Sequence, residues 1–339
     1  MKLPVLLALI YILQYASAQQ SVSLSGRIPH PKSDKIYIRY FTDFLTYKEV
    51  TADSAILDKQ GNFEMTFSWE KAYPAILYYG EDIMEMFLTP GDSLSLIWDA
   101  KRFDSSLSYT GKGSRANKHI LEDLLLDNYP TGDTYRLPEE EYLSWVDSIT
   151  EQAKERLDQD FKIELSSDPN AKPYINYAQN EIIYNQANLK LDYPGLNAYV
   201  QKQKGYTPVS PGYYDFLNEI TIDNPEALIV ENYHDFILKY ANHKAKELYK
   251  QDTTKTFLEH RDLFANQMSD PVEEYILAAW SYNAMTDEGE LERGKKWLDD
   301  LNALAPGSKY ISLLHEAYEG MLKLSPGNVA PDLRLKDQK

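Results

Sequence analysis

Few residues of this 339-residue chain combine the types and spacing that catalysis requires. The segment Gly111-Lys112-Gly113-Ser114 contains a Gly-Lys pair, as a phosphate-binding loop does. That loop needs Ser or Thr directly after the lysine and a further glycine upstream, and Gly113 occupies the Ser/Thr position. We therefore interpret the segment as a connector from sheet to helix, with Ser114 as the N-cap of the helix.

A zinc-protease helix carries two histidines one turn apart, with a glutamate beside the first. His315-Glu316 has this beginning, but Glu319 stands where the second histidine belongs, and no third ligand follows with a convincing spacing. We interpret this segment as a solvated helix face.

The remaining histidines do not converge in the sequence: they are His30, His119, His234, His243 and His260. His234 and His243 are nine residues apart, which places them on opposite sides of a helix. The chain has no Gly-x-Ser-x-Gly motif and no cysteine, so these nucleophile signatures are missing. The sequence predicts no catalytic, metal-binding or cofactor-binding residue, and no cofactor.

Tyrosine is the outlier of the composition, with 27 residues. Tyr174, Tyr177 and Tyr184 fall close to one face of a predicted helix, and three more flank a Gly/Pro-rich connector: Tyr206, Tyr213 and Tyr214. Such rings pack in a helical core or, where exposed, stack on peptide or sugar ligands. Both interpretations are compatible with the spacing.

The formal net charge of −17 at pH 7 restricts the partners. A surface of this sign repels phosphate backbones, so we expect no nucleic-acid binding. It equally disfavours a site on anionic lipid. The partners that remain are other envelope proteins or peptides.

The N-terminus has the three parts of a secretory signal peptide over residues 1–18. Lys2 supplies the positive charge, Leu3 to Leu13 is mostly apolar, and Ala16-Ser17-Ala18 is a small-x-small cleavage site. The apolar run is too short to span a bilayer. We expect a periplasmic protein with no membrane anchor in the mature chain.

In residues 19–112 the apolar residues recur at every second position, as they do in β-strands. Phe63, Met65, Phe67 and Trp69 alternate with polar residues, which is typical of half-buried strands. Further strands are predicted at Val22 to Leu24, Lys35 to Phe41, Ala75 to Tyr79 and Leu94 to Trp98. The segments Asp58 to Asn62 and Thr89 to Asp92 are predicted to be a hairpin loop and a type II turn. We expect an antiparallel β-sandwich or a small barrel.

Residues 113–325 have the period of helices, which predicts an all-α helical bundle. The first helix starts near Ser114 and is expected to bury Ile120, Leu121, Leu124 and Leu125. The others are predicted from Pro138 to Leu165, Pro173 to Leu191, Pro225 to Tyr249, Thr254 to Gln267, Pro271 to Met285, Leu291 to Leu304 and Ser308 to Leu324. Gly195 to Pro211 is predicted to be a connector. The predicted fold class is α+β.

The ending Gly327-Asn328-Val329-Ala330-Pro331-Asp332-Leu333 resembles the opening segment of TlpA/ResA-type thioredoxins and peroxiredoxins. Upstream, Ser25-Gly26, Ala52 to Ala55, Phe87 to Leu94 and Thr110-Gly111 occur in the order found in the uncharacterised β domain that precedes TlpA-like thioredoxins. The resemblance implies that residues 326–339 begin a thioredoxin-like domain that is truncated here. We expect residues from Gly327 to be extended and poorly packed.

The resemblance also implies that the family's Cys-x-x-Cys chemistry belongs to that missing domain. We therefore predict a non-catalytic, exported module of a TlpA/ResA-like thiol-disulfide oxidoreductase that positions the thioredoxin domain or recruits its clients. The alternative is a periplasmic peptide- or glycan-binding protein that uses its tyrosine-rich helices. An unrecognised hydrolase would need convergent carboxylates or a metal, to which no motif points.

Overall fold

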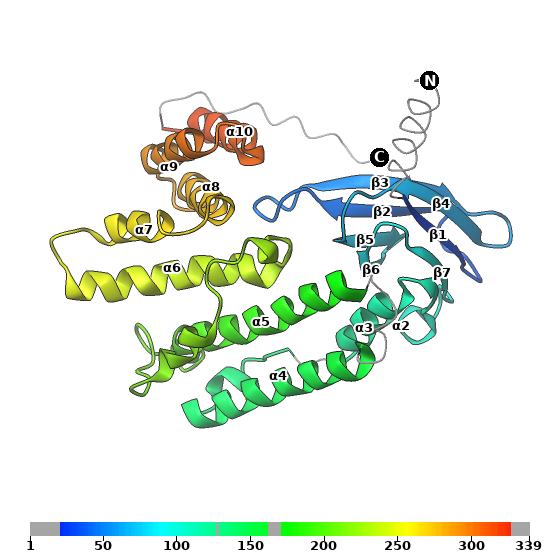
Figure 1. Cartoon of the computed structure of the whole chain (residues 1–339), viewed down its shortest axis with the longest axis horizontal. Helices are drawn as coiled ribbons and strands as arrows, with labels where there is room; N and C mark the ends of the chain where they lie inside the picture. The colour runs from blue at the N-terminus through cyan, green and yellow to red at the C-terminus, as the bar shows by residue number, and fades with distance from the viewer. Residues whose placement is uncertain (1–20, 127–128, 162–170, 327–339) are drawn as a thin grey trace, which may run out of the picture. The chain divides into compact units, whose positions relative to one another are not determined.

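The computed structural model describes residues 21–126, 129–161 and 171–326 (Figure 1). Its fold class is α+β, with a β-rich N-terminal part followed by helices. The chain divides into two compact units, Met1–Ser210 and Pro211–Lys339. The predicted signal peptide, residues 1–18, lies outside the described residues, as do residues 327–339 of the expected thioredoxin-like segment. The predicted boundary between a β domain and a helical domain after residue 112 stays a prediction.

The first unit contains a four-stranded sheet in the order β4-β1-β7-β8. These strands span Asn62–Ser68, Ser21–Arg27, Ser93–Ile97 and Ser108–Lys112. β1 pairs antiparallel with β4 and parallel with β7. The predicted strands around Val22, Phe63 and Leu94 are therefore confirmed, and their alternating apolar residues are the buried ones.

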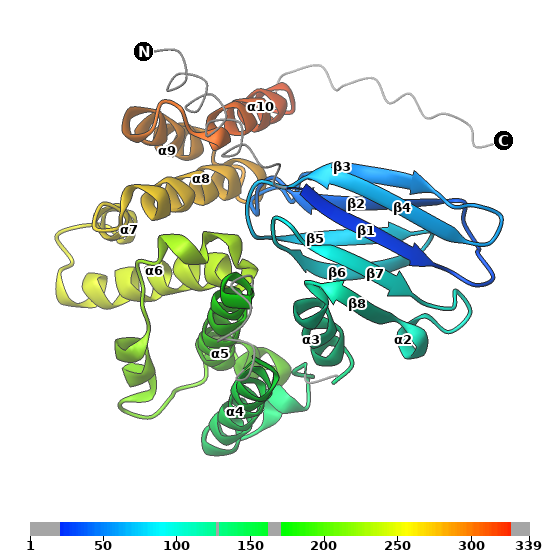
Figure 2. The ribbon, with the colours of Figure 1, turned by 45° about the vertical axis from the view of Figure 1, so that its right-hand side comes forward.

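A second four-stranded sheet has the order β3-β2-β5-β6 and is antiparallel throughout (Figure 2). Its strands span Glu49–Ile56, Lys35–Phe41, Tyr73–Tyr79 and Asp82–Leu88. In each sheet the outer strands pair with one neighbour only, so the described strands form two open sheets and no closed barrel.

The two sheets contribute to one apolar core. Trp98, which follows β7, is fully buried. Its ring centroid lies 5.7 Å from that of Tyr79 on β5 and 6.1 Å from that of Phe63 on β4. Edge-to-face aromatic contacts of this kind add to the free energy gained from burial.

One turn prediction is confirmed and one is corrected. Thr89 to Asp92 forms a turn with Gly91 at a φ of +87°, as a type II turn requires. Asp58 to Asn62 is a tight loop closed by a hydrogen bond from Asp58 N to Asn62 O. It is not a hairpin, because β3 and β4 on its two sides belong to different sheets.

The helices of the first unit follow β7 and β8. They are α2 (Phe103–Ser106), α3 (Ser114–Leu124), the short 3-10 helix η1 (Thr134–Arg136), α4 (Glu139–Phe161) and α5 (Ala171–Val200). α3 packs on β6 and β8, whereas α4 and α5 run side by side (Figures 1 and 2).

The buried face of α3 differs from the predicted one. Its buried residues are Asn117 and His119, whereas Leu124 and Leu125 are 40% and 56% exposed. Asn117 is buried because β6 is an edge strand whose backbone needs partners. Its side-chain amide accepts from Phe87 N at 3.0 Å and donates to Phe87 O at 3.1 Å.

α5 is longer than predicted and continues through Pro194 to Val200, so the predicted connector begins too early. Tertiary contacts outweigh the proline and glycine signals here. The buried Asn197 donates to Tyr135 O at 2.7 Å and accepts from Thr207 Oγ1 at 2.7 Å. These bonds hold the last turns of the helix against the segments around Tyr135 and Thr207.

The second unit is helical. Two 3-10 helices, η3 (Tyr213–Glu219) and η4 (Pro225–Ile229), precede α6 (Glu231–Gln251), α7 (Phe257–Ala265), α8 (Asp270–Thr286), α9 (Leu291–Leu304) and α10 (Lys309–Lys323). The long predicted helices in this region are confirmed, but the one predicted from Pro225 begins as α6 only at Glu231, since Pro225–Ile229 forms the separate 3-10 helix η4 and Val230 is extended. Thr256 caps α7 in a capping box with Glu259. α6 packs on α7, and α8, α9 and α10 pack together.

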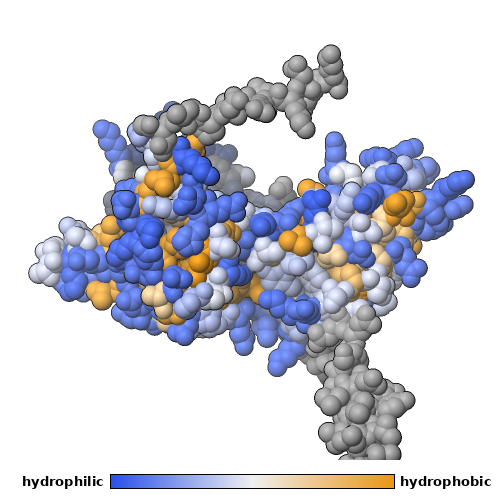
Figure 3. All heavy atoms as spheres, turned by 90° about the horizontal axis from the view of Figure 1, so that it is seen from above, coloured by the Kyte–Doolittle hydropathy of each residue, from blue (hydrophilic) through white to orange (hydrophobic). Residues whose placement is uncertain are grey.

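None of the described helices combines the length and the apolar character that crossing a membrane demands. On the face of the molecule in Figure 3, hydrophilic residues predominate and hydrophobic ones form small patches.

Candidate functional site

The candidate site is a groove between the end of α4 and the start of α5. Its position follows from the packing of the start of α4 against the end of α5. Tyr142 of α4 stacks on Tyr193 of α5, with their ring centroids 4.4 Å apart, and donates a hydrogen bond to Leu189 O at 3.0 Å. Lys190 of α5 forms an ion pair with Asp147 of α4 at 2.8 Å. These contacts close the space between the helices near the start of α4.

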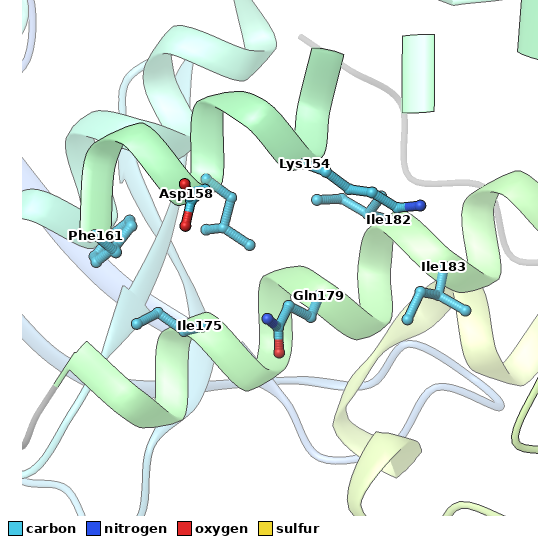
Figure 4. Close-up of a pocket in the computed structure, with 8 residues that line it drawn as sticks. Lys154, Asp158, Phe161, Ile175, Gln179, Ile182 and Ile183 are labelled. Carbon is cyan, nitrogen blue, oxygen red and sulfur yellow. The ribbon is translucent and has the colours of Figure 1, made fainter. Parts of the chain in front are cut away.

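Further along, the two helices leave a groove of about 400 Å³. It is lined by Lys154, Leu157, Asp158 and Phe161 of α4 and by Ile175, Gln179, Ile182 and Ile183 of α5 (Figure 4). The volume falls within the range of sites that hold small molecules or side chains, about 300–1,000 Å³. The groove therefore has the size of a binding site.

The floor of the groove is apolar. Leu157, Phe161 and Ile175 are buried, and Ile182 is half-buried beside the exposed Ile183. The predicted spacing of the apolar residues of α4 places Leu157 and Phe161 on one face, as the structure confirms. An apolar ligand group would bury additional surface here, which is the main favourable contribution to such binding.

The rim of the groove is polar. Lys154 and Asp158 lie one turn apart on α4, and Gln179 lines the groove from α5 (Figure 4). Lys154 forms no ion pair within the described part of the chain. The amide of Gln179 offers both a donor and an acceptor, which is what a peptide backbone needs. The arrangement can hold an apolar group in the floor and a neutral polar chain at the rim.

A charge network centred on the buried His119 joins α3 to α4. The His119 side chain is 2% exposed, and its Nδ1 lies 2.7 Å from Asp160 Oδ2. Its Nε2 lies 3.3 Å from Asp123 Oδ2. Arg115 pairs with Asp160 at 2.6 Å, and Arg156 pairs with Asp123 at 2.9 Å. Each carboxylate therefore faces the imidazole and one guanidinium.

These neighbours favour the charged imidazolium. Burial by itself lowers the pKa of His119, but the carboxylates of Asp123 and Asp160 outweigh it and raise this pKa above its ordinary value of 6.5. Since Nδ1 and Nε2 both face carboxylates, no ring nitrogen is placed to activate a nucleophile. The network serves to hold the two helices together.

The tyrosines singled out in the sequence belong mainly to the core. Tyr174, Tyr184 and Tyr213 are 3%, 1% and 6% exposed. Burial raises the pKa of Tyr174 well above its ordinary value. Tyr206, in contrast, is 67% exposed. The core interpretation is confirmed for the three buried rings, whose faces are not available to a ligand.

The other sequence candidates are separate from the groove. His315, Glu316 and Glu319 are exposed on α10, which confirms the interpretation as a solvated helix face. His234 stacks on Tyr275 with a centroid distance of 4.2 Å, and His243 contacts Tyr214 with tilted rings 4.1 Å apart. The ring of His30 is exposed, and its Nδ1 lies 3.8 Å from Asp99 Oδ1. His260 contacts Asp252 O at 2.9 Å through its Nε2.

The segment Gly111 to Ser114 connects β8 to α3, as predicted. Ser114 is not the N-cap: Gly113 takes that position with a φ of +89°, and Ser114 is the first helical residue. Among the residues that the structure describes, no three His, Cys, Asp or Glu side chains are arranged to hold a metal ion.

Comparison with known proteins yields no match: no family model, no curated protein and no solved structure is significantly similar to the chain.

Proposed function

We propose that the chain is an exported, non-catalytic module of a TlpA/ResA-like thiol-disulfide oxidoreductase, and that it recruits unfolded client polypeptides. In this proposal the two sheets form a β-sandwich and the helices form bundles that present the binding surface. The sequence motifs support the family, and the groove between α4 and α5 supports the client-binding role.

The observation that carries this function is the pairing of an apolar floor with a polar rim in the groove. In this proposal the clients are polypeptides that have not finished folding, which expose apolar side chains and unpaired backbone groups. Leu157, Phe161 and Ile182 match the apolar side chains. The amide of Gln179 can donate to and accept from the backbone groups of a client. Lys154 and Asp158 carry opposite charges, so the rim has no net charge of its own.

The test uses a fluorescently labelled insulin B chain whose cysteines are blocked with iodoacetamide, so that no disulfide chemistry contributes. Fluorescence anisotropy measures its affinity for the wild type and for Ile182→Glu. A carboxylate in the apolar floor removes apolar contact and has to be desolvated, so we expect affinity to fall at least about 10-fold.

Ile97→Glu is the matched control, because Ile97 is 51% exposed on β7 and does not line the groove. Its affinity should stay within about twofold of the wild type, which corresponds to less than about 0.5 kcal/mol. Equal affinity of the wild type and Ile182→Glu would show that the probe binds elsewhere. A failure of all three proteins to bind would refute the client-binding role.

A further inference from the structure

Arg261 on α7 differs from the other half-buried arginines of the described residues, because it forms no ion pair with a carboxylate. The other four each form an ion pair: Arg39 with Glu49 at 2.9 Å, Arg115 with Asp160 at 2.6 Å, Arg156 with Asp123 at 2.9 Å and Arg293 with Glu290 at 2.9 Å. A partly desolvated charge without a counter-charge is costly, so its presence calls for a reason.

Two tryptophans contact this guanidinium. The Arg261 Cζ lies 4.2 Å from the ring centroid of Trp280 on α8 and 5.2 Å from that of Trp297 on α9. Both tryptophans are only 2% exposed, so they form a rigid wall. These cation–π contacts restrict the side chain before any ligand arrives, which lowers the entropy lost on binding.

Asp262, whose negative charge acts on Arg261, is already engaged with other groups. Asp262 accepts a hydrogen bond from Trp297 Nε1 at 2.8 Å and another from Lys296 at 3.0 Å. Glu288 and Glu290 both pair with Arg293. Burial and the charge of Arg293 lower the pKa of Arg261 to about 10, which leaves it charged at neutral pH. The positive charge of Arg261 is therefore available to an external anion.

The two terminal nitrogens of Arg261 are the atoms that a ligand would meet. The Nε is buried and has no hydrogen-bond partner among the described residues. The Nη nitrogens make no hydrogen bond in the described part of the chain either, but they are not among its buried, unpartnered atoms. Both Nη nitrogens therefore keep contact with solvent.

We propose that Arg261 binds a carboxylate group of a ligand, as a rigid guanidinium fork backed by Trp280 and Trp297. A planar guanidinium with adjacent free donors pairs with both oxygens of a carboxylate. The site lies in the second unit and does not depend on the client-binding role of the groove in the first. Its ligand is a peptide C-terminus or a free organic acid, since both present the same group.

The experiment follows the indole N–H signals of the uniformly ¹⁵N-labelled protein by NMR. Three probes are titrated: acetyl-trialanine with a free C-terminus, the same peptide as its amide, and succinate. We expect the free acid peptide or succinate to shift the signals of Trp280 and Trp297 with a saturable curve, and the amide peptide to leave them unchanged. A stronger response to the peptide identifies a C-terminus as the ligand, and a stronger response to succinate identifies a free acid.

Three variants separate recognition from folding. Arg261→Gln should weaken binding at least about 10-fold, and Arg261→Lys should weaken it as well, because an ammonium retains the charge and loses the fork. Arg293→Gln should bind within about threefold of the wild type, since that arginine is already neutralised. No saturable shift with either acid, equal shifts with the amide peptide, or unchanged binding by a folded Arg261→Gln would each overturn the proposal.

Discussion

At the scale of single residues, His119 shows how charge is used in the interior of the first unit. Its side chain is 2% exposed, lies between two carboxylates and joins α3 to α4. Its ring also contacts those of Phe161 and Tyr174, with centroid distances of 5.8 and 5.9 Å. Phe161 lines the groove, so the network supports the floor of the candidate site.

We predict that stability depends on the ionisation of His119. Its pKa is raised in the folded state, so its contribution is fully present below the unfolded value of about 6.5 and is lost as pH rises through the folded value. The free energy of unfolding should therefore fall as pH rises above about 6.5, and His119→Leu should lack this fall. Urea unfolding at a series of pH values measures both.

His119→Leu should also cost about 1–2 kcal/mol at pH 6, because the partly exposed carboxylates of Asp123 and Asp160 lose a cationic partner while Arg115 and Arg156 remain. His315→Leu is the control, since His315 is exposed on α10. The same pH dependence in the wild type and in His119→Leu would assign the titration to another group.

Sequence reasoning could not find this network. Asp160 is 41 residues from His119, and only the packing of α3 on α4 brings them together. For the same reason the arginines with and without a counter-charge cannot be told apart in the sequence. The interpretation of His315 to Glu319 as a solvated helix face could be made from the sequence, because the motif it was compared with has strict local spacing.

At the scale of elements, the turn between β8 and α3 depends on Gly113. Its φ of +89° is one that residues with a Cβ rarely adopt. A Cβ at this position would lie 2.5 Å from the Asp92 carboxyl carbon. The carboxylate of Asp92 cannot yield freely, because it accepts a hydrogen bond from Thr89 N at 2.8 Å.

We therefore expect Gly113→Ala to destabilise the protein by about 2–4 kcal/mol, the sum of backbone strain and the clash with Asp92. Gly205→Ala separates the two contributions, since Gly205 has a similar φ of +84° and no atom within 4 Å of its Cβ position. Its cost should be about 1–2 kcal/mol. Thermal unfolding of both variants makes the comparison, and equal costs would contradict the role of Asp92.

Most elements could be predicted from the sequence, because their periodicity and end signals are local. The alternation of Phe63, Met65 and Phe67 predicts β4, and the spacing from Leu291 to Leu304 predicts α9. The failures occur where tertiary contacts decide. Asn197 keeps α5 helical beyond Pro194, and the loop after β3 leads to the other sheet instead of closing a hairpin.

At the scale of the whole molecule, the absence of cysteine from the 339 residues limits its chemistry. Reduction of a disulfide requires a thiolate nucleophile and a resolving thiol. We predict that the chain does not accelerate the reduction of insulin by dithiothreitol above the uncatalysed rate. Turbidity from the released B chain measures this. Turnover above the background would contradict a non-catalytic module.

The candidate groove was beyond the reach of sequence reasoning, although its apolar residues were partly anticipated on α4. Leu157 and Phe161 are part of the predicted apolar face, but the sequence does not show that Ile175 and Ile182 lie opposite them. Their alignment follows from the contact between Tyr142 and Tyr193 at the other end of the helices. The groove is thus a product of packing between two elements.

The measurement that tests the central claim most directly is site-specific photo-crosslinking in the groove. A benzophenone side chain at Gln179 is irradiated with the blocked insulin B chain, and a matched protein carries it at Gln152, which is exposed on α4 outside the groove. Client recruitment through the groove predicts an adduct at position 179 and none at position 152. The adduct at position 179 should disappear when the same protein also carries Ile182→Glu. Equal adducts at both positions, or none at 179, would contradict it.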